Sequence, residues 1–258
     1  MARRQALSAL KIEPIACLKD NYAYLVSDAG LCAVIDPSEA EPVEAALRAR
    51  GVKLTHILNT HHHWDHTGGN GALKKAHGAV VVGPAKDRER IPGIDIGVEE
   101  RQGWRFGEHQ VRILEVPAHT RGAIAFVFPN AVFTGDTLFA MGCGRLFEGT
   151  PVMMHASLAK LMALPDDTEV YCGHEYTLNN GRFALTLEPG NRDLQARMKA
   201  VEAQRAKGEP TMPSSIGLEK RTNPFLRTGS AQIRAALKME SADDVAVFAE
   251  IRRRKDAF

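Results

Sequence analysis

This 258-residue sequence has few cysteines and no long apolar run, and each of these absences excludes a class of protein. The cysteines are far apart and form no C-x-x-C pair, so neither a zinc ribbon nor a thioredoxin-type redox motif is indicated. No run approaches the roughly 18 apolar residues of a membrane-spanning helix. A disulfide framework is not expected in a chain of this length with so few cysteines, and we predict reduced thiols at Cys17, Cys32, Cys143 and Cys172.

An excess of either charge is also missing. Lys plus Arg total 33 and Asp plus Glu total 31, which gives a net charge of +2 and argues against a general polyanion binder. The N-terminus carries paired Arg3 and Arg4, but Lys11 interrupts the apolar stretch that follows. We therefore expect no secretory signal and a cytoplasmic protein.

The first two thirds of the sequence mix short, β-branched-rich apolar runs with helical patterns. The runs predict strands at residues 24–26, 31–35, 54–58, 79–82, 111–116, 123–128, 131–134 and 169–172. The helical patterns lie at residues 39–50, 69–77 and 155–164. This mixture predicts a sheet-rich α/β fold rather than a helical bundle.

The pattern changes near residue 175, after which we expect helices and no strand. A polar, Ala-rich stretch predicts a helix over 191–207, and a shorter helix is expected over 211–223. Ser241, with Asp244 three positions later, has the form of an N-terminal capping signature for the last helix. The sequence therefore predicts two domains, residues 1–174 and 175–258.

Histidine is abundant, and its ten copies are not evenly spread. One cluster of ligand-type side chains directly follows an apolar run: His61, His63, Asp65 and His66. Imidazole and carboxylate suit a borderline or hard divalent ion such as zinc, iron or manganese. If alternate residues point in different directions, His61 and His63 face one ion, and the other two residues face a neighbouring ion. A solvated polar loop is the alternative, but Trp64 and Asp65 interrupt any simple histidine tract.

Three more potential ligands follow the ends of later apolar runs: His119, Asp136 and His174. In sheet-based folds, functional groups gather at the carboxyl ends of strands, where loops converge on a rigid frame. A single histidine after a strand is more often a structural residue. Several strand ends that deliver His and Asp together instead indicate a metal site.

The pattern His-x-His-x-Asp-His, followed by a separate His, Asp and His, resembles the metallo-β-lactamase superfamily, whose fold is an αββα sandwich. The resemblance covers the first domain. It implies two metal sites joined by a bridging residue: His61, His63 and His119 at one, Asp65, His66 and His174 at the other, and Asp136 between them. The remaining histidines match no ligand position and are expected to be structural or surface residues: His56, His62, His77, His109 and His155.

Further motifs resemble the hydroxyacylglutathione hydrolase (glyoxalase II) family over essentially the full chain. They lie at residues 139–150, 173–177, 222–227 and 251–256. Motif alignment with that family, whose second domain supplies much of the glutathione site, implies these substrate-binding residues: Arg145, Phe147, Tyr176, Arg252 and Lys255. Some family members carry Tyr where this chain has Phe147 and Lys where it has Arg145. The loss of the Tyr hydroxyl bears on substrate affinity and not on the chemistry.

The basic residues near the C-terminus can also be interpreted without the family. Arg252 and Lys255 are three positions apart on a predicted helix, so they project from one face. Two cations there could clamp a carboxylate, with Arg able to bind bidentately. From the residues alone, the alternative is a solvated basic helix end that complements the helix dipole.

The resemblance implies hydrolysis of S-D-lactoylglutathione, and of related 2-hydroxyacylglutathione thioesters, to glutathione and D-lactate. This reaction is the second step of glutathione-dependent methylglyoxal detoxification. Two divalent metal ions are implied, zinc first, with iron or manganese as alternatives. A hydroxide that bridges the ions, held by Asp136 and Asp65, would attack the thioester carbonyl. The leaving thiolate, whose parent thiol has a pKa of roughly 8.5, needs no strong general acid.

Other interpretations of the same site stay open. Another hydrolase of the superfamily is disfavoured by the lack of a secretory signal and by the balanced charge, which gives no nucleic-acid footprint. A mononuclear-iron persulfide dioxygenase on the same fold is disfavoured by the C-terminal helices and the pair Arg252 and Lys255. A non-enzymatic metal-dependent binding module is a remote alternative. We expect a monomer whose partner is a small-molecule glutathione thioester, with neither nucleic acid nor membrane involved.

Overall fold

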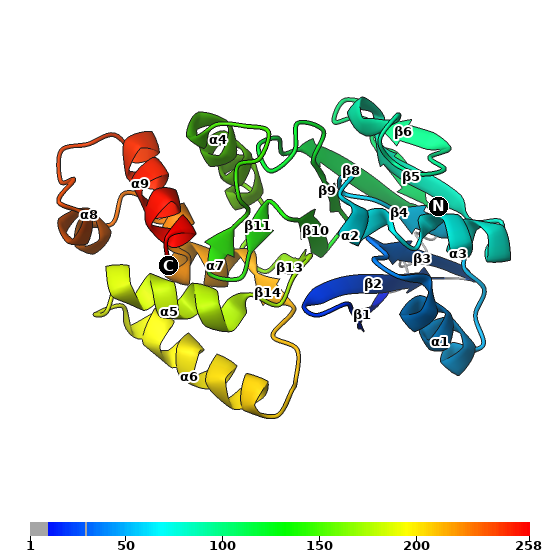
Figure 1. Ribbon diagram of the computed structural model, residues 1–258, viewed down its shortest axis with the longest axis horizontal. Coiled ribbons are helices and arrows are strands. Elements are labelled where there is room, and N and C mark those ends of the chain that lie inside the picture. The colour runs from blue at the N-terminus through cyan, green and yellow to red at the C-terminus, as the bar shows by residue number, and fades with distance from the viewer. Residues whose placement is uncertain (1–9, 29) are drawn as a thin grey trace, which may run out of the picture. The chain divides into compact units, whose positions relative to one another are not determined.

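The computed structural model describes residues 10–28 and 30–258 (Figure 1). The expectation of no secretory signal rests mainly on residues 1–9, which lie outside the described residues. Among the helices of the described residues, none is both long and apolar enough to cross a membrane. The described residues divide into two compact units, the first formed by those of residues 10–114 with 126–129 and the second by residues 115–125 with 130–258.

The first unit contains a six-stranded sheet whose strands follow one another in chain order. The strands are β1 (Lys11–Cys17), β2 (Asn21–Asp28), β3 (Leu31–Ile35), β4 (His56–Leu58), β5 (Val80–Pro84) and β6 (Ile96–Val98). β1, β2 and β3 pair antiparallel, whereas β3 to β6 pair parallel. Parallel neighbours need crossover connections, and helices supply them between β3 and β5. These helices are α1 (Ala40–Arg50), α2 (Trp64–Thr67) and α3 (Asn70–His77).

Helix α1 shows how the sequence fixes the ends of an element in this unit. The chain enters from an extended residue, Glu39, and leaves through Gly51, whose φ of 62° is left-handed and therefore favours glycine. Val43 and Leu47, one helical turn apart, are buried in the core of the unit. Burial of each such side chain stabilises the fold by about 1.5–3 kcal/mol. The 3-10 helix η1 (Ala85–Asp87) and the antiparallel strands β7 (Trp104–Phe106) and β8 (His109–Glu115) follow.

The second unit combines a short mixed sheet with most of the helices. Its strand β10 (Ala131–Gly135), which follows β9 (Ile124–Val127), pairs parallel with β13 (Glu169–Cys172), and β13 pairs antiparallel with β14 (Ser214–Ser215). Strands β11 (Leu138–Phe139) and β12 (Gly142–Cys143) form a small hairpin. The helices are α4 (Pro151–Met162), α5 (Thr177–Leu187), α6 (Arg192–Ala206), α7 (Ile216–Thr222), η2 (Pro224–Leu226), α8 (Ala231–Leu237) and α9 (Asp244–Asp256).

Each predicted strand segment coincides with a strand of the structure, and the four cysteines are buried free thiols, as predicted. Helix α4 begins earlier than predicted because Thr150 caps it, accepting a hydrogen bond from the main-chain nitrogen of Met153, and Pro151 occupies its first turn. Short elements that the sequence analysis did not predict include β6, β7 and α8.

Two expectations for the C-terminal part are wrong. A strand does occur after residue 175, because the two residues of β14 extend the sheet at β13; two residues are too few to show an alternating pattern. Asp243, not Ser241, caps α9, since its carboxylate accepts a hydrogen bond of 2.8 Å from the main-chain nitrogen of Ala246. Both residue types cap helices well, so the sequence left the register open.

Candidate metal centre

The histidine-rich segment is a loop between β4 and α2 that is closed by buried polar contacts. The fully buried Asn59 begins it and donates to the carbonyl oxygen of His66 at 3.0 Å and to Oδ1 of Asn70 at 3.3 Å. After the loop, Gly68 lies so close to Ser38 that a Cβ at position 68 would come within 2.5 Å of the Ser38 carbonyl oxygen. The close approach therefore requires glycine there.

Protein atoms hold the outer ring nitrogens of two histidines, His61 in this loop and His66 in α2. Nδ1 of His61 lies 3.0 Å from the Thr60 hydroxyl, and Nδ1 of His66 lies 3.1 Å from Oδ2 of Asp36. The Thr60 hydroxyl donates to Asp36 at 2.6 Å, so it accepts from Nδ1 of His61 and places the lone pair of that ring on Nε2. Nε2 of His61 lies 3.1 Å from Nδ1 of His63. Such outer partners fix the tautomer and orientation of metal-binding histidines.

Asp65 is held in place from its main chain as well as its side chain. The Asn21 amide donates to the carbonyl oxygen of Asp65 at 3.0 Å and to its carboxylate at 3.1 Å. The Ser38 hydroxyl donates to the same carbonyl at 2.5 Å. The Asp65 carboxylate lies 3.7 Å from Nε2 of His66. The first unit thus presents a carboxylate and an imidazole nitrogen side by side.

The second unit contributes a matching set around Asp136. Nε2 of His119 lies 3.3 Å from Oδ2 of Asp136, and Nε2 of His174 lies 3.2 Å from the same oxygen. Nδ1 of His119 is 3.0 Å from the carbonyl oxygen of Arg145, so Nδ1 donates and the lone pair of the ring is on Nε2. A Cβ at Gly144 would overlap the Asp136 carbonyl oxygen and come within 3.0 Å of the His119 ring. Glycine at 144 therefore lets the chain pass directly beside two ligands.

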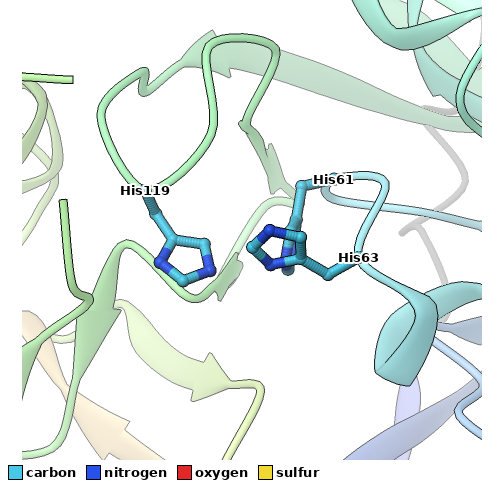
Figure 2. Close-up of side chains that lie close together, drawn as sticks. All are labelled: His61, His63 and His119. Carbon is cyan, nitrogen blue, oxygen red and sulfur yellow. The ribbon is translucent and has the colours of Figure 1, made fainter. Parts of the chain in front are cut away.

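The ligand atoms of the predicted metal-binding residues form close groups. His61, His63 and His119 offer atoms within 4.8 Å of one another (Figure 2), as do Asp65, His66 and His174. Asp36 groups with His61 and His66 in the same way, but its oxygens already accept hydrogen bonds from Thr60 and His66, so we place it in an outer layer. Imidazole nitrogens and carboxylate oxygens whose outer sides are held by protein fit divalent metal ions.

The five histidines predicted to be non-ligands all have other partners. His62, His77 and His109 each lie within 2.9 Å of a carboxylate. Burial lowers the pKa of His56, whose ring packs edge-on against Trp104, and His155 packs edge-on against Phe248. The three carboxylate partners are Asp87, Glu44 and Asp28, in the order of those histidines.

Two exposed aromatic side chains lie against the ligands of the second unit. The Tyr176 ring stacks on His174 at a centroid distance of 4.8 Å and an interplanar angle of 3°, and 37% of the residue is exposed. Phe147 meets His119 edge-on at 5.2 Å and is 61% exposed. Both predicted substrate-binding residues are therefore beside metal-ligand candidates and open to solvent.

The predicted cations of α9 differ from each other in their surroundings. Arg252 is 6% exposed and donates to the carbonyl oxygen of Cys143 at 2.8 Å, while its Nη2 lies 2.9 Å from Asp256. Lys255 donates to Oδ1 of Asn179. Burial, helped by the positive charges of Arg252 and Arg145, lowers the pKa of Lys255 to about 8. Sequence reasoning missed Asn179, which carries no motif.

Comparison with known proteins then assigns the chain to a family. Residues 19–174 match the model of the metallo-beta-lactamase superfamily, and residues 175–258 match that of the hydroxyacylglutathione hydrolase C-terminus. A hydroxyacylglutathione hydrolase of Methylococcus capsulatus is 53% identical over 253 residues, covering 96% of this chain and 99% of the relative. One of Brucella anthropi is 51% identical, covering 96% and 97%. The chain belongs to the hydroxyacylglutathione hydrolase family.

Solved structures share the fold of this chain. ETHE1 from Myxococcus xanthus is 26% identical with a TM-score of 0.66, covering 97% of this chain and 99% of that one. TTHA1623, solved in a di-iron-bound form, is 28% identical with a TM-score of 0.60, covering 84% of this chain and 100% of that one. The predicted family, the fold class of a metallo-β-lactamase domain followed by a helical part, and the enzyme class of hydrolase are all confirmed.

Proposed function

We propose that this hydroxyacylglutathione hydrolase family member hydrolyses S-D-lactoylglutathione, and related 2-hydroxyacylglutathione thioesters, to glutathione and D-lactate. One observation carries the proposal: the second unit holds both a set of metal-ligand candidates around Asp136 and a cationic group near the C-terminus. A thioester of an anionic peptide needs both, because the carbonyl must be activated while the carboxylates of the peptide are bound. The names of the relatives point to the same substrate.

The donor chemistry supports a centre of two divalent ions, with zinc first and iron or manganese as alternatives. One ion would be held by His61, His63 and His119, and a second by Asp65, His66 and His174, with Asp136 shared between them. The di-iron form of TTHA1623 is consistent with two ions on this fold. When bound, such ions lower the pKa of a water and polarise the carbonyl to be attacked.

The residues of the chain then have distinct roles in the reaction. Asp65, fixed by Asn21 and Ser38, and Asp136, placed between two imidazoles, orient the attacking water and accept its hydrogen bonds. The oxygen of the water, which loses a proton to solvent, bonds to the thioester carbonyl carbon. The carbon–sulfur bond then breaks, and its electron pair leaves with the sulfur as a thiolate. Because the parent thiol has a pKa of roughly 8.5, the thiolate departs without a general acid.

The cationic group is proposed to bind the glutathione half of the substrate. Arg145, with an exposed side chain, and Lys255 are placed to attract a carboxylate, and Arg252 adds a fixed positive charge behind them. Tyr176 offers a hydroxyl beside His174. Phe147 presents an apolar ring where a hydroxyl would add a hydrogen bond, so this chain binds the substrate with one contact fewer.

The two domains predicted from the sequence are proposed to have separate roles. Residues 1–174 act as the catalytic domain and residues 175–258 as the substrate-binding domain, and the two family-model matches, over residues 19–174 and 175–258, meet at the same boundary. We place the reaction in the cytoplasm, as the second step of glutathione-dependent methylglyoxal detoxification by a monomer. Neither nucleic acid nor a membrane has a part in it.

The test is a hydrolysis assay on purified protein loaded separately with zinc, iron or manganese. S-D-lactoylglutathione should be consumed with loss of thioester absorbance and formation of one thiol per substrate. A β-lactam, a phosphodiester and glutathione persulfide serve as competing substrates, the last with oxygen uptake as the readout. Turnover of one of these without thioester hydrolysis would replace the proposal with another superfamily activity.

A further inference from the structure

A small hairpin joins two parts of the candidate site. Strands β11 and β12, with the turn between them, occupy residues 138–143, which are all buried. Asp136 lies two residues before this hairpin, and Arg145 lies two residues after it. The turn includes Met141 at a φ of 54°, a left-handed conformation that is costly for a residue other than glycine. The hairpin therefore needs external support to keep its shape.

Side chains from the helical part supply that support by bonding to the main chain of the hairpin. Asn223 donates to the carbonyl oxygens of Phe139 at 3.1 Å and Gly142 at 3.0 Å, and Asn180 donates to that of Ala140 at 3.1 Å. Arg252 donates to the carbonyl oxygen of Cys143. The main-chain nitrogen of Met141 donates to Oε2 of Glu219 at 2.8 Å. These polar atoms are buried, and a buried donor or acceptor that loses its partner destabilises the fold.

Glu219 is the central residue of this support. It is fully buried in α7, and its Oε1 accepts from Arg197 at 2.6 Å and from the Ser214 hydroxyl at 2.5 Å. Its Oε2 accepts from Met141 and from the Asn223 amide at 3.0 Å. Both oxygens therefore face only donors. A carboxylate satisfies all of them, whereas an amide, with one oxygen and one NH₂ group, cannot.

The position of the hairpin affects two candidate metal ligands: Asp136, which precedes it, and His119, whose ring is bonded to the segment that follows it. The main-chain nitrogen of Gly144 donates to the carbonyl oxygen of Thr137 at 3.2 Å, which closes the chain just beyond the hairpin. Next to this closure, the carbonyl oxygen of Arg145 fixes the His119 ring, and Asp136 faces His119. A shift of the turn would thus move one carboxylate and one imidazole relative to each other.

We propose that Glu219 is a positioning residue for the metal centre, acting through the 138–143 hairpin on Asp136 and His119. The inference rests on the proposed function only for the identity of the reaction, because the ligand geometry concerns metal binding itself. Glu219 touches neither candidate ligand, and its effect passes through the main chain. This role gives α7 a part in the metal centre beyond the recognition of substrate.

A pair of matched substitutions tests the proposal. In Glu219→Gln, if the amide oxygen still accepts the hydrogen bond from Arg197, the NH₂ group points toward the donor nitrogens of Met141 and Asn223 and cannot accept from them. Glu188→Gln is the control: Glu188 is also buried in the second unit and accepts from Arg227 at 2.7 and 2.9 Å and from Ser230, but it bonds the helical part to itself. The measurement is competition between each protein and a chelator for zinc, without substrate, together with thermal unfolding of the metal-free forms.

We expect Glu219→Gln to weaken zinc binding about tenfold, the lower end of the effect of residues that support metal ligands. Glu188→Gln should change the zinc affinity less than about twofold, even if it lowers the unfolding temperature of the metal-free protein as much as Glu219→Gln does. Equal zinc affinities in both variants would overturn the proposal and leave Glu219 a stabilising residue. If Glu219→Gln does not fold, Asn180→Ala replaces it, since this change removes a neutral hydrogen bond to the Ala140 carbonyl; unchanged zinc affinity there would overturn the proposal equally. A wild-type protein that binds zinc but does not hydrolyse the thioester would refute the proposed function and leave this test intact.

Discussion

Raising the pH from 7 to 9 is expected to remove the positive charge of Lys255 and with it much of the affinity for a glutathione thioester. Burial and the charges of Arg252 and Arg145 lower the pKa of Lys255 to about 8, while Asp256 opposes the change. The ammonium is therefore about nine-tenths protonated at pH 7 and about one-tenth at pH 9. Because the charged form is the one that attracts a carboxylate, kcat/KM should fall about tenfold over this interval, on the alkaline side of the profile.

The assay is the pH dependence of kcat/KM and of kcat for S-D-lactoylglutathione. The free protein governs kcat/KM, so the decline should appear there, whereas kcat should stay nearly level because a bound carboxylate stabilises the charged Lys255. Lys255→Arg keeps its charge throughout the range, since the guanidinium pKa exceeds about 12, and should abolish the decline. A small thioester without glutathione carboxylates should not show it. A level wild-type profile between pH 7 and 9, or a decline that persists in Lys255→Arg, would refute this reasoning.

Three further substitutions probe the centre and the cationic group. Asp136→Ala should release one of two bound ions and lower kcat at least about a hundredfold, so a fully active variant with two ions by metal analysis would contradict the shared ligand. Gly144→Ala places a methyl group against the Asp136 carbonyl and should lower zinc affinity by about 10- to 100-fold in chelator competition, and unchanged affinity would show that the chain can shift there at no cost. Lys255→Ala should raise KM for glutathione thioesters by roughly 10- to 100-fold and leave small thioesters nearly unaffected, whereas equal changes would assign Lys255 a general structural role.

The candidate metal ligands could be picked out from this sequence, and found close together in the structure, because they obey a simple local rule. Most of them closely follow an apolar run that forms a strand, and a strand end is a fixed point from which a side chain reaches a shared site, whereas Asp65 and His66 lie in α2. The same rule would have found Asp36, which directly follows β3 and holds the outer nitrogen of His66. Its role as a supporting acceptor, however, depends on Oδ2 meeting both the Thr60 hydroxyl and the His66 imidazole, and that is not visible in a linear sequence.

The residues that support the site could not be predicted, because their partners are main-chain atoms far away in the sequence. Glu219 bonds to a nitrogen 78 positions earlier, and Asn223 bonds to carbonyl oxygens 84 and 81 positions earlier. Main-chain acceptors carry no residue identity, so no motif marks them. Two-residue strands such as β11, β12 and β14 could not be predicted either, because two residues are too few to show the alternation of apolar and polar side chains that indicates a strand.

Arg252 shows why the two cations of α9 are not equivalent. Its guanidinium is buried and planar, donates to the Cys143 carbonyl and lies beside Asp256, so it is part of the frame around the 138–143 hairpin. An ammonium in its place could not reach both acceptors with the same fixed geometry. The charge of Arg252 is nevertheless near enough to lower the pKa of Lys255. In the proposed anion site, Arg252 would supply a permanent charge that belongs to the frame and Lys255 a titrating charge toward the substrate. Of these two residues, only Lys255 would then make recognition depend on pH.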